Sequence, residues 1–292
     1  MFITVFTPTY NRSRLLLRLF DSLCKQTFKD FEWVVVDDGS TDETKSLSLA
    51  LSEGKGSFFP IRYFYQENGG KHCAINRGVK EAKGELFFIV DSDDKLPPNA
   101  LQLVAEQYEG IKGNNKFAGV CGLDGTFDGN VIGSGLPTDL LDESSIAIRF
   151  KFGITGDMKE VFRTEVLREF SFPEIEGERF CPEMLVWNRI ATKYILRYFN
   201  HIIYSVEYQN DGITSNIIKA RMHSPTATMM AYAEMLKYDV PYMVKMKSAI
   251  NYWRFRFCSK TTDKPKSDWR YLWTMPIGYL MHVKDLWTCN LQ

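Results

Sequence analysis

Four short apolar runs alternate with helix-like segments over the first 110 residues, and this alternation constrains the fold more than any other feature of the chain. Short runs rich in β-branched and aromatic residues are typical of buried β-strands. The four runs are Phe2–Phe6, Trp33–Val36, Ile61–Tyr65 and Leu86–Val90. Because strands that alternate with helices are joined by right-handed crossovers, the pattern predicts an α/β fold with a mainly parallel, Rossmann-like sheet flanked by helices.

Helices are expected between those runs and again later in the chain. Leu15, Leu16 and Leu19 recur at helical spacing after the first run. Ser40 and Glu43 have the spacing of a capping box, which predicts that a helix begins beside them. The expected helices are Ser13–Lys25, Asp42–Leu51, Lys71–Ala82, Asn99–Tyr108 and Pro182–Lys193. Between the last two, Ala118–Phe180 is less regular, and its glycine-rich part, Gly122–Gly135, is typical of a hairpin and loops.

Polar and turn residues follow each of the four predicted strands. They are Thr7–Asn11, Asp37–Ser40, Asn68–Lys71 and Asp91–Asp94. The carboxyl ends of parallel strands meet at one edge of the sheet, and open α/β sheets bind their ligands beyond that edge. The sequence therefore predicts a binding site there.

Asp91 and Asp93 have the D-x-D spacing that lets two carboxylates converge on one hard cation. A divalent metal at this position could bridge a diphosphate and neutralise its charge as it leaves. The alternative is a solvated acidic turn that caps the next helix. The position of the pair directly after a buried strand favours the metal site.

Other residues at this edge have both a functional and a structural interpretation. Asp38 could accept hydrogen bonds from a base or a ribose, or could simply form a turn. Lys71 follows two glycines and could lie near a phosphate, although no Walker A pattern is present, and it could equally be a surface lysine. Asn76 gives a weaker signal of the same kind. Glu183, in the first turn of its expected helix, is either a partner of the helix dipole or a general base.

Taken together, these segments resemble the family 2 glycosyltransferases, which have a GT-A fold. The match covers about the first 110 residues in the order and spacing of the family, and a weaker match continues through Phe162–Glu165 and Gly177–Phe180 to Glu183. The matching pieces are Thr7–Arg12, Gln26–Phe28, Phe31–Glu32, Val36–Asp42, Asn68–Gly70, Ala74 with Asn76 and Gly78, and Asp91–Asp94.

The resemblance implies an inverting transfer of a sugar from a nucleotide diphosphate sugar by a single displacement. Asp93 would be the main protein ligand of Mn²⁺ or Mg²⁺, which stabilises the departing diphosphate, and Glu183 would take the proton of the acceptor hydroxyl. Thr7 and Asp38 would hold the nucleotide base. The residues expected to bind the donor are Thr7, Thr9, Asn11, Arg12, Asp38, Lys71, Asn76, Asp91 and Ser92, and those expected to hold the metal are Asp93 and Asp91.

The resemblance also implies how the chain is divided and what it acts on. Residues 1–218 would form the GT-A catalytic domain, with a nucleotide-sugar-binding half in 1–110 and an acceptor-side half in 111–218, and 219–292 would form a helical C-terminal extension. The family favours a UDP-sugar as donor. Bacterial relatives favour a glycan or lipid-linked saccharide as acceptor, in the synthesis of surface polysaccharide. The Q-x-x-R-W motif of processive synthases is missing, so one sugar per encounter is expected.

One departure from the family concerns the catalytic base. The family often has an acidic pair there, whereas Met184 follows Glu183, so Glu178 and Asp157 are alternative candidates. Met184 is also the only support for a non-catalytic protein that binds nucleotide sugars. A nucleotidyltransferase that makes nucleotide sugars would share the sheet and the metal site. It usually has a glycine-rich basic loop after the first strand, which Thr7–Arg12 lacks.

Charge is balanced in the whole chain but not along it. Lys+Arg and Asp+Glu both number 36, so net charge gives no argument for nucleic acid as a partner. From Ala220 to the end, 11 basic residues face 5 acidic ones, and four of the six tryptophans lie there. Tyr252–Phe257 interleaves cations and aromatics, which suits either an anionic membrane surface or packing against protein, with arginine stems covering apolar surface.

The sequence has no feature of a secreted or membrane-spanning protein. No apolar stretch reaches the ~18 residues that a membrane span needs. Pro8 and Asn11 interrupt the short apolar start, which excludes a signal peptide. The six cysteines are scattered without a C-x-x-C pair, so reduced thiols are expected. We expect a cytoplasmic enzyme, with peripheral contact at the inner face of the membrane if its acceptor is lipid-linked.

Overall fold

The computed structural model describes residues 1–54, 58–207, 216–261 and 264–289. They group into two compact units. The first consists of Met1–Ser171 and Asn188–Gln209, and the second of Phe172–Trp187 and Asn210–Gln292. Phe172–Trp187 thus joins the C-terminal helices, whereas the division expected from the sequence assigns it to the catalytic domain. That division concerns function and stays a prediction.

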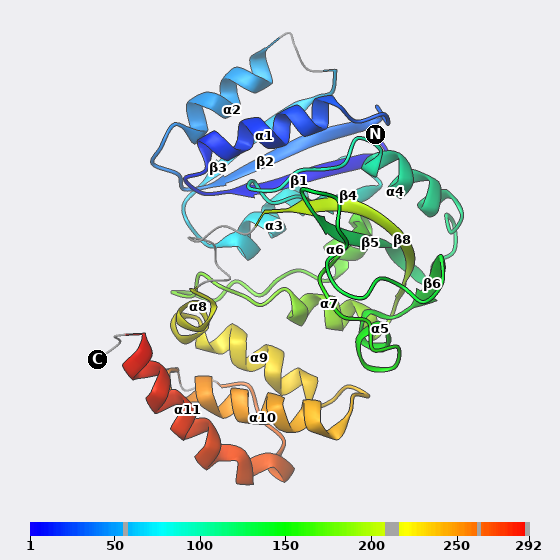
Figure 1. Ribbon diagram of the computed structural model, residues 1–292. Helices are drawn as coiled ribbons and strands as arrows, with labels where there is room; N and C mark the ends of the chain where they lie inside the picture. The colour runs from blue at the N-terminus through cyan, green and yellow to red at the C-terminus, as the bar shows by residue number, and fades with distance from the viewer. Residues whose placement is uncertain (55–57, 208–215, 262–263, 290–292) are drawn as a thin grey trace. The chain divides into compact units, whose positions relative to one another are not determined.

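The first unit is built on one eight-stranded sheet with the order β3-β2-β1-β4-β7-β5-β8-β6 (Figure 1). Strands β1 to β4 run parallel, as predicted, while β7 is antiparallel to both of its neighbours and β6 is antiparallel to β8. The strands are β1 Ile3–Thr9, β2 Phe31–Asp38, β3 Ile61–Gln66, β4 Leu86–Ile89, β5 Phe117–Thr126, β6 Leu140–Glu143, β7 Met158–Arg163 and β8 Ile195–Val206.

Helices cover both faces of the parallel part of this sheet (Figure 1). Helices α1 and α4 contribute Leu16, Leu19 and Val104 to the main core, where these side chains meet Val5 and Val35 of the sheet, and α2 adds partly buried leucines. Helix α3 packs on the opposite face. The helices of this unit are α1 Ser13–Cys24, α2 Thr44–Glu53, α3 Lys71–Glu81, α4 Ala100–Glu109, α5 Ser145–Phe150 and α6 Thr164–Glu169, and α7 Met184–Ala191 links it to the second unit. The five expected helices are confirmed, with ends within two residues of the expected ones.

Two glycines of the family pattern have structural roles around α3. Gly70 precedes the helix with φ 95°, a conformation that residues with a side chain rarely adopt. Gly78 lies within α3, where an added Cβ would come within 2.2 Å of the ring of Phe6. A larger residue at either position would therefore displace α3 from the sheet.

The predicted capping box at the start of α2 is wrong. The residue before the helix is Glu43, whose side chain makes no capping bond, and Asp42 Oδ1 accepts the N–H of Thr44 at 3.0 Å. The Ser40 hydroxyl instead accepts the N–H of Asn11 at 2.8 Å, and the Asn11 Oδ1 accepts the N–H of Thr41 at 2.8 Å. Ser40 therefore joins the loops that follow β1 and β2, a long-range role that local spacing could not reveal.

The middle of the chain is more regular than expected. The predicted hairpin turn exists, because the N–H of Thr126 donates to the carbonyl of Asn130 at 2.8 Å. Gly122 is not part of a loop, however: it lies inside β5, a ten-residue strand paired with β7 and β8. Glycine-rich composition concealed a central strand.

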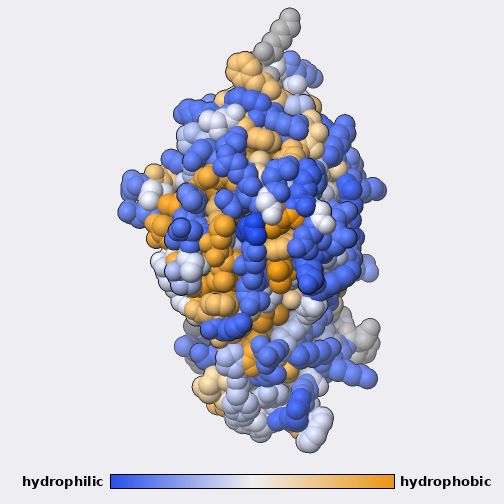
Figure 2. All heavy atoms as spheres, turned by 90° about the vertical axis from the view of Figure 1, so that its right-hand side faces the viewer, coloured by the Kyte–Doolittle hydropathy of each residue, from blue (hydrophilic) through white to orange (hydrophobic). Residues whose placement is uncertain are grey.

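The second unit is helical. Its core includes Met222, Met229, Tyr252 and Phe255, and α10 packs against both α9 and α11. Tyr252 and Phe255 are 3% and 0% exposed and pack within this unit, whereas Phe257 is 40% exposed, so Tyr252–Phe257 is only partly open to solvent. No helix among the described residues combines the length and apolarity needed to cross a bilayer. The elements are α8 Ile217–His223, α9 Pro225–Met235, α10 Tyr242–Arg256, the 3-10 helix η2 Trp269–Thr274, and α11 Met275–Thr288. Figure 2 shows one face of the molecule, on which hydrophobic and hydrophilic residues are intermixed, as on most protein surfaces.

Candidate functional site

The candidate site lies at the carboxyl edge of the parallel strands in the first unit. In the sheet, β2 and β3 lie on one side of β1 and β4 lies on the other. The chain therefore leaves β1 and β4 in opposite directions along the sheet, which is where open α/β sheets form their ligand crevice. The loops that flank this point are Tyr10–Arg12 and Asp91–Asp94.

Asp38, at the end of β2, fixes the turn that leads into α3. Its Oδ1 accepts the side-chain amide of Gln66 at 2.8 Å and the N–H of Gly69 at 2.9 Å, and its Oδ2 accepts the N–H of Gly70 at 2.7 Å. The residue is only 4% exposed. A residue predicted to hold the nucleotide base thus also holds the start of α3 in place.

The neighbouring threonines of β1 differ in what their hydroxyls contact. Thr7 is fully buried, and its hydroxyl accepts the indole N–H of Trp33 at 2.9 Å. Thr9 is 3% exposed, and its Oγ1 has no hydrogen-bond partner among the described residues. Thr7 therefore has a structural partner, while the hydroxyl of Thr9 remains available at the strand end.

Asp91 pairs with Lys71, the first residue of α3. The Lys71 ammonium lies 2.8 Å from one oxygen of the Asp91 carboxylate and 3.0 Å from the other. Burial raises the pKa of Asp91, but the positive charges of Lys71 and Lys159 outweigh this and leave its pKa below the ordinary value. The pair puts a cation beside the acidic turn, and the expectation that Lys71 lies near a phosphate stays a prediction.

Asp93 is in the opposite electrostatic situation. Burial and then the negative charge of Asp91 raise its pKa, while the positive charges of Arg12 and Lys71 lower it. Arg12 thus comes close enough to the acidic turn to act on it. The guanidinium of Arg18, on α1, donates a hydrogen bond to the backbone carbonyl of Asp93 and so helps to fix the turn.

Asp94 and Tyr204 form a hydrogen-bonded pair beneath the turn. The Tyr204 hydroxyl donates to Asp94 Oδ2 at 2.6 Å and accepts the N–H of Asp91 at 2.9 Å. Burial, partly offset by the Tyr204 hydrogen bond, raises the pKa of Asp94 to about 6. Tyr204 comes from β8, more than a hundred residues away in sequence, so it fixes the turn through a contact that no local motif indicates.

Three further charged residues at this edge were missed by the sequence analysis. Asp124 of β5 is 4% exposed, and its Oδ1 has no partner in the described part of the chain. Burial raises its pKa to about 6, against the positive charge of Lys159. Burial also raises the pKa of Glu160 on β7 to about 7. Lys159 lies with its ammonium 3.7 Å from the centre of the Tyr204 ring and acts on Asp91, Asp94 and Asp124.

The remaining predicted donor-binding residues lie around this edge. Asn11 and Arg12 form the loop after β1, where Asn11 is held by Ser40 and Thr41. Ser92 is 6% exposed and lies between Asp91 and Asp93. Asn76 is half-buried on α3. All the predicted donor-binding residues belong to the first unit, in β1, the loop after β1, β2, α3 and the loop after β4.

The carboxylates of Asp91 and Asp93 fit a divalent cation that takes most of its ligands from substrate phosphates and water. In the described ranges there is no group of three or more His, Cys, Asp or Glu residues arranged to hold a metal ion. Asp91 and Asp93 are nevertheless close enough for the charge of one to raise the pKa of the other, and a cation would relieve that repulsion. Mg²⁺ typically uses one or two carboxylates together with substrate phosphates and water. Asp93 and Asp91 suit that mode of binding.

The candidates for the catalytic base have different surroundings. Glu183 lies directly before α7, one residue outside the helix, and its carbonyl accepts the N–H groups of Val186 and Trp187. The Glu178 carboxylate accepts the N–H groups of Thr226 at 2.7 Å and Ala227 at 2.9 Å, so it caps the start of α9. Asp157, in the first unit, is exposed near Asp124. The capping role of Glu178 makes it a poor candidate, because a capping carboxylate is not available to accept a proton.

Comparison with known proteins gives one family. The model of the family described as "Glycosyl transferase family 2" matches residues 4–119. The GalNAc(5)-diNAcBac-PP-undecaprenol beta-1,3-glucosyltransferase of Campylobacter jejuni is 30% identical over 222 residues, which are 73% of this chain and 67% of that protein. An uncharacterized glycosyltransferase of Rickettsia typhi is 37% identical over 100 residues, 34% of this chain. The match spans only 30% of that relative's length.

Solved structures share the fold over nearly the whole chain. Staphylococcus aureus TarS in complex with UDP covers 90% of this chain and 74% of its own, with a TM-score of 0.59 and 21% identity. The mannosyltransferase PcManGT of Pyrobaculum calidifontis, in complex with GDP-Man and Mn²⁺, covers 97% of this chain and 74% of its own, with a TM-score of 0.57 and 18% identity. The sheet and its helices therefore have the GT-A architecture that the sequence predicted.

Proposed function

The chain belongs to glycosyl transferase family 2, and we propose that it is a metal-dependent, inverting enzyme that transfers one sugar at a time. The proposed donor is a UDP-sugar, and the proposed acceptor is a glycan or lipid-linked saccharide. We propose that the enzyme acts in the cytoplasm, in the synthesis of surface polysaccharide. One observation carries the proposal: Asp91, Asp93 and Lys71 meet at the carboxyl edge between β1 and β4. We further propose that residues 1–218 are the catalytic domain and 219–292 its extension.

Relatives support the class of donor and acceptor. TarS has been seen with UDP and with UDP-GlcNAc, and PcManGT with GDP-Man and Mn²⁺, so GT-A proteins of this architecture bind nucleoside diphosphate sugars. The Campylobacter relative is named for a substrate on an undecaprenyl diphosphate carrier. These likenesses favour a nucleoside diphosphate donor and a lipid-linked acceptor for this chain.

The chemistry assigned to the residues is a single displacement. In this proposal Thr9 and Asp38 would orient the base and ribose, and Lys71 and Arg12 would supply positive charge to the diphosphate. The Thr9 hydroxyl, which has no partner among the described residues, and the charges around the acidic turn support these roles. Asp93 and Asp91 would hold a divalent cation, which supplies charge neutralisation for the leaving diphosphate. Glu183 takes the proton of the acceptor hydroxyl as its oxygen attacks the anomeric carbon, and the bond to the diphosphate breaks on the opposite side. The product therefore has the inverted configuration.

The first test is nucleotide binding. Calorimetric titration of the protein with UDP, GDP and other nucleoside diphosphates, with and without Mn²⁺, should show that one diphosphate binds and that Mn²⁺ strengthens its binding. Asp93→Ala should abolish the gain from Mn²⁺, whereas Asp139→Ala, at an exposed acid, should leave it unchanged. If no diphosphate binds with or without metal, the transferase proposal fails.

A second test separates an enzyme from a non-catalytic binding protein. Slow hydrolysis of the bound donor in the absence of acceptor indicates turnover, and its absence at saturating donor indicates a binding protein. Glu183→Gln should leave diphosphate affinity unchanged but lower transfer at least 100-fold, since general base catalysis contributes about 10²–10⁴ in rate. Inversion is checked by the anomeric configuration of the product in NMR spectra.

A further inference from the structure

Helix α11 of the second unit turns its polar side inward and its apolar side outward. Its buried positions are Thr274 just before it, Gly278, His282 and Asp285. Pro276, Leu280, Val283 and Trp287 recur on the opposite side at spacings of four, three and four residues, which is one stripe of an α-helix. Leu280 is 68% exposed and Trp287 is 81% exposed. A helix that faces water has the reverse arrangement.

Specific contacts on the inner side fix this orientation. Arg254 of α10 makes two parallel bonds to Asp285, with Nε 2.5 Å from Oδ2 and Nη2 2.6 Å from Oδ1. A Cβ added to Gly278 would come within 2.5 Å of the Cβ of Trp253, so the two helices approach closely at that point. Rotating α11 to bury its apolar stripe would break the ion pair and separate the helices. The outward apolar side is therefore a fixed feature of the fold.

The 3-10 helix η2, which directly precedes α11 in the chain, also exposes large apolar side chains. It ends at Thr274, where α11 begins, and Tyr271 anchors it with only 7% exposure. Its other large side chains are open to solvent, with Trp269 82% exposed and Trp273 53% exposed. We call the following residues the apolar face: Trp269, Leu272, Trp273, Ile277, Leu280 and Trp287. Grouped exposure of large apolar side chains marks an interaction surface.

The segment that carries the apolar face is rich in positive charge. Between Tyr242 and Cys289 the chain has nine Lys and Arg residues and three Asp residues. Two of the acids, Asp268 and Asp285, lie in ion pairs with Arg270 and Arg254. The remaining basic residues include Lys266 and Lys284, both exposed close to the apolar face in sequence.

We propose that the apolar face and its basic surroundings dock the protein on an anionic lipid bilayer. Tryptophan and tyrosine rings favour the headgroup region, where the ring contacts hydrocarbon and the N–H or O–H contacts water, and lysines add attraction to anionic headgroups. The apolar face would contact the bilayer at its surface, and no helix among the described residues is able to cross one. The docking surface is α11 and η2, not Tyr252–Phe257, and it does not depend on the proposed catalysis.

Charge favours a bilayer over a second copy of the chain. In a two-fold symmetric dimer the same surface meets itself, so the positive surroundings of one apolar face would meet those of the other. Like charges brought together across an interface oppose association. An anionic bilayer would cover the same apolar residues and would neutralise the excess of positive charge.

The test is cosedimentation of the full chain with vesicles of phosphatidylcholine, alone or with about one third phosphatidylglycerol. We expect binding to the anionic vesicles that weakens as salt is raised, since salt screens exposed charges. Leu280→Ala combined with Trp287→Ala should lower the partition coefficient roughly 100-fold, because each large apolar side chain contributes about tenfold or more. Phe58→Ala is the matched control: Phe58 is 80% exposed in the first unit, and its loss should leave partitioning unchanged.

Three results would overturn the proposal. The first is that the wild-type chain does not bind anionic vesicles. The second is that the double variant binds them as well as the wild type. The third is that the wild type is a dimer in sedimentation equilibrium without vesicles and the double variant is a monomer, which would make the apolar face a contact between copies. Thermal melts and diphosphate titration of the same samples report misfolding and catalytic-site loss separately, so failure of the proposed function is distinguishable.

Discussion

The two ends of the parallel strands both contain buried carboxylates, but the two ends satisfy them differently. At the amino end, Glu32 is fully buried and accepts the Thr4 hydroxyl at 2.7 Å, the N–H of Lys83 at 2.8 Å and the Arg62 guanidinium at 3.2 Å. At the carboxyl end, Asp94, Asp124 and Glu160 have pKa values raised by burial, and Asp124 has an oxygen without a partner among the described residues.

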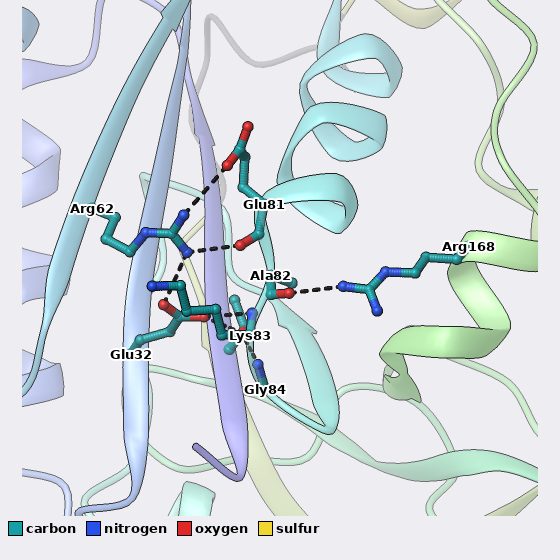
Figure 3. A network of polar contacts seen from close by, with 8 residues as sticks. Glu32, Arg62, Glu81, Ala82, Lys83, Gly84 and Arg168 are labelled. Carbon is teal, nitrogen blue, oxygen red and sulfur yellow. Dashed lines mark hydrogen bonds and ion pairs between the residues drawn. The ribbon is translucent and has the colours of Figure 1, made fainter.

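The amino-end network connects three strands and two helices. Figure 3 shows Arg62 between Glu32 and Glu81, where it also donates to the Glu81 carbonyl at 2.7 Å, and Arg168 reaching the carbonyl of Ala82 from α6 at 2.8 Å. We infer that the buried carboxylates at the two ends have different roles. A fully bonded carboxylate such as Glu32 stabilises the fold, whereas an incompletely bonded one such as Asp124 costs stability and is retained where a ligand completes it.

The largest effect on stability is expected at the amino end. Glu32→Ala leaves the Thr4 hydroxyl, the Lys83 N–H and the buried side of Arg62 without their acceptor. Breaking a buried pair by removing one partner costs about 3–5 kcal/mol, so the free energy of unfolding should fall by that amount in urea denaturation. Glu53→Ala, at an exposed glutamate, should change it by less than about 0.5 kcal/mol. A small effect of Glu32→Ala would remove the contrast between the two ends.

The next effect has the opposite sign and comes from the carboxyl end. Burial raises the pKa of Asp124 to about 6, above its unfolded value of about 3.9, so the folded state binds more protons between these pH values. Stability from this group is present below about pH 4 and is lost as the pH rises through 6. Asp124→Asn should therefore raise the unfolding free energy at pH 8 by about 1–2 kcal/mol and flatten its dependence between pH 4 and pH 6. Urea denaturation at pH 5 and pH 8 measures both. A destabilised variant at pH 8 would contradict the interpretation.

Tyr204 lies at the carboxyl end, but its hydroxyl makes two hydrogen bonds, so a variant at this residue tests whether a bonded group there also serves ligand binding. Tyr204→Phe removes a donor to Asp94 and the acceptor for the Asp91 N–H. Losing such a buried bond costs about 1–2 kcal/mol of stability. Because the acidic turn loses its support, we also expect weaker diphosphate binding in the presence of Mn²⁺. Tyr194→Phe, whose hydroxyl bonds Glu169 at the exposed surface, is the control and should alter neither. Unchanged diphosphate affinity in Tyr204→Phe would assign Tyr204 to stability alone.

The fold of the first half was predictable because its signals are local. Strand-length apolar runs, helical spacing and strand-end polar clusters each involve neighbouring residues, and β1 to β4 follow from them. Glu32 was matched as part of the family pattern, but only the structure shows that its role is structural. Lys159 and Asp124 were missed because their contacts join strands distant in sequence, and β5 was hidden by its glycines. The inverted orientation of α11 depends on the Arg254–Asp285 pair, which no spacing rule identifies.

The smallest expected stability effect tests the ion pair between Lys71 and Asp91 in the proposed donor site, which is partly open to solvent. Lys71 and Asp91 have side chains 29% and 27% exposed, so solvent screens their attraction, and Lys71→Ala should cost less than about 1 kcal/mol of stability. The positive charge of Lys71 lowers the pKa of Asp91, so the contribution of the pair is present above the unfolded pKa of Asp91 and is lost as pH falls through the folded one. Diphosphate affinity should fall roughly tenfold, because a cation beside the phosphates is removed. Lys80→Ala, an exposed lysine on the same helix, should leave affinity unchanged. If Lys71→Ala lowers stability but not diphosphate affinity, Lys71 has a structural role like that of Arg62 at the amino end. The carboxyl end would then have no ligand-binding role for Lys71.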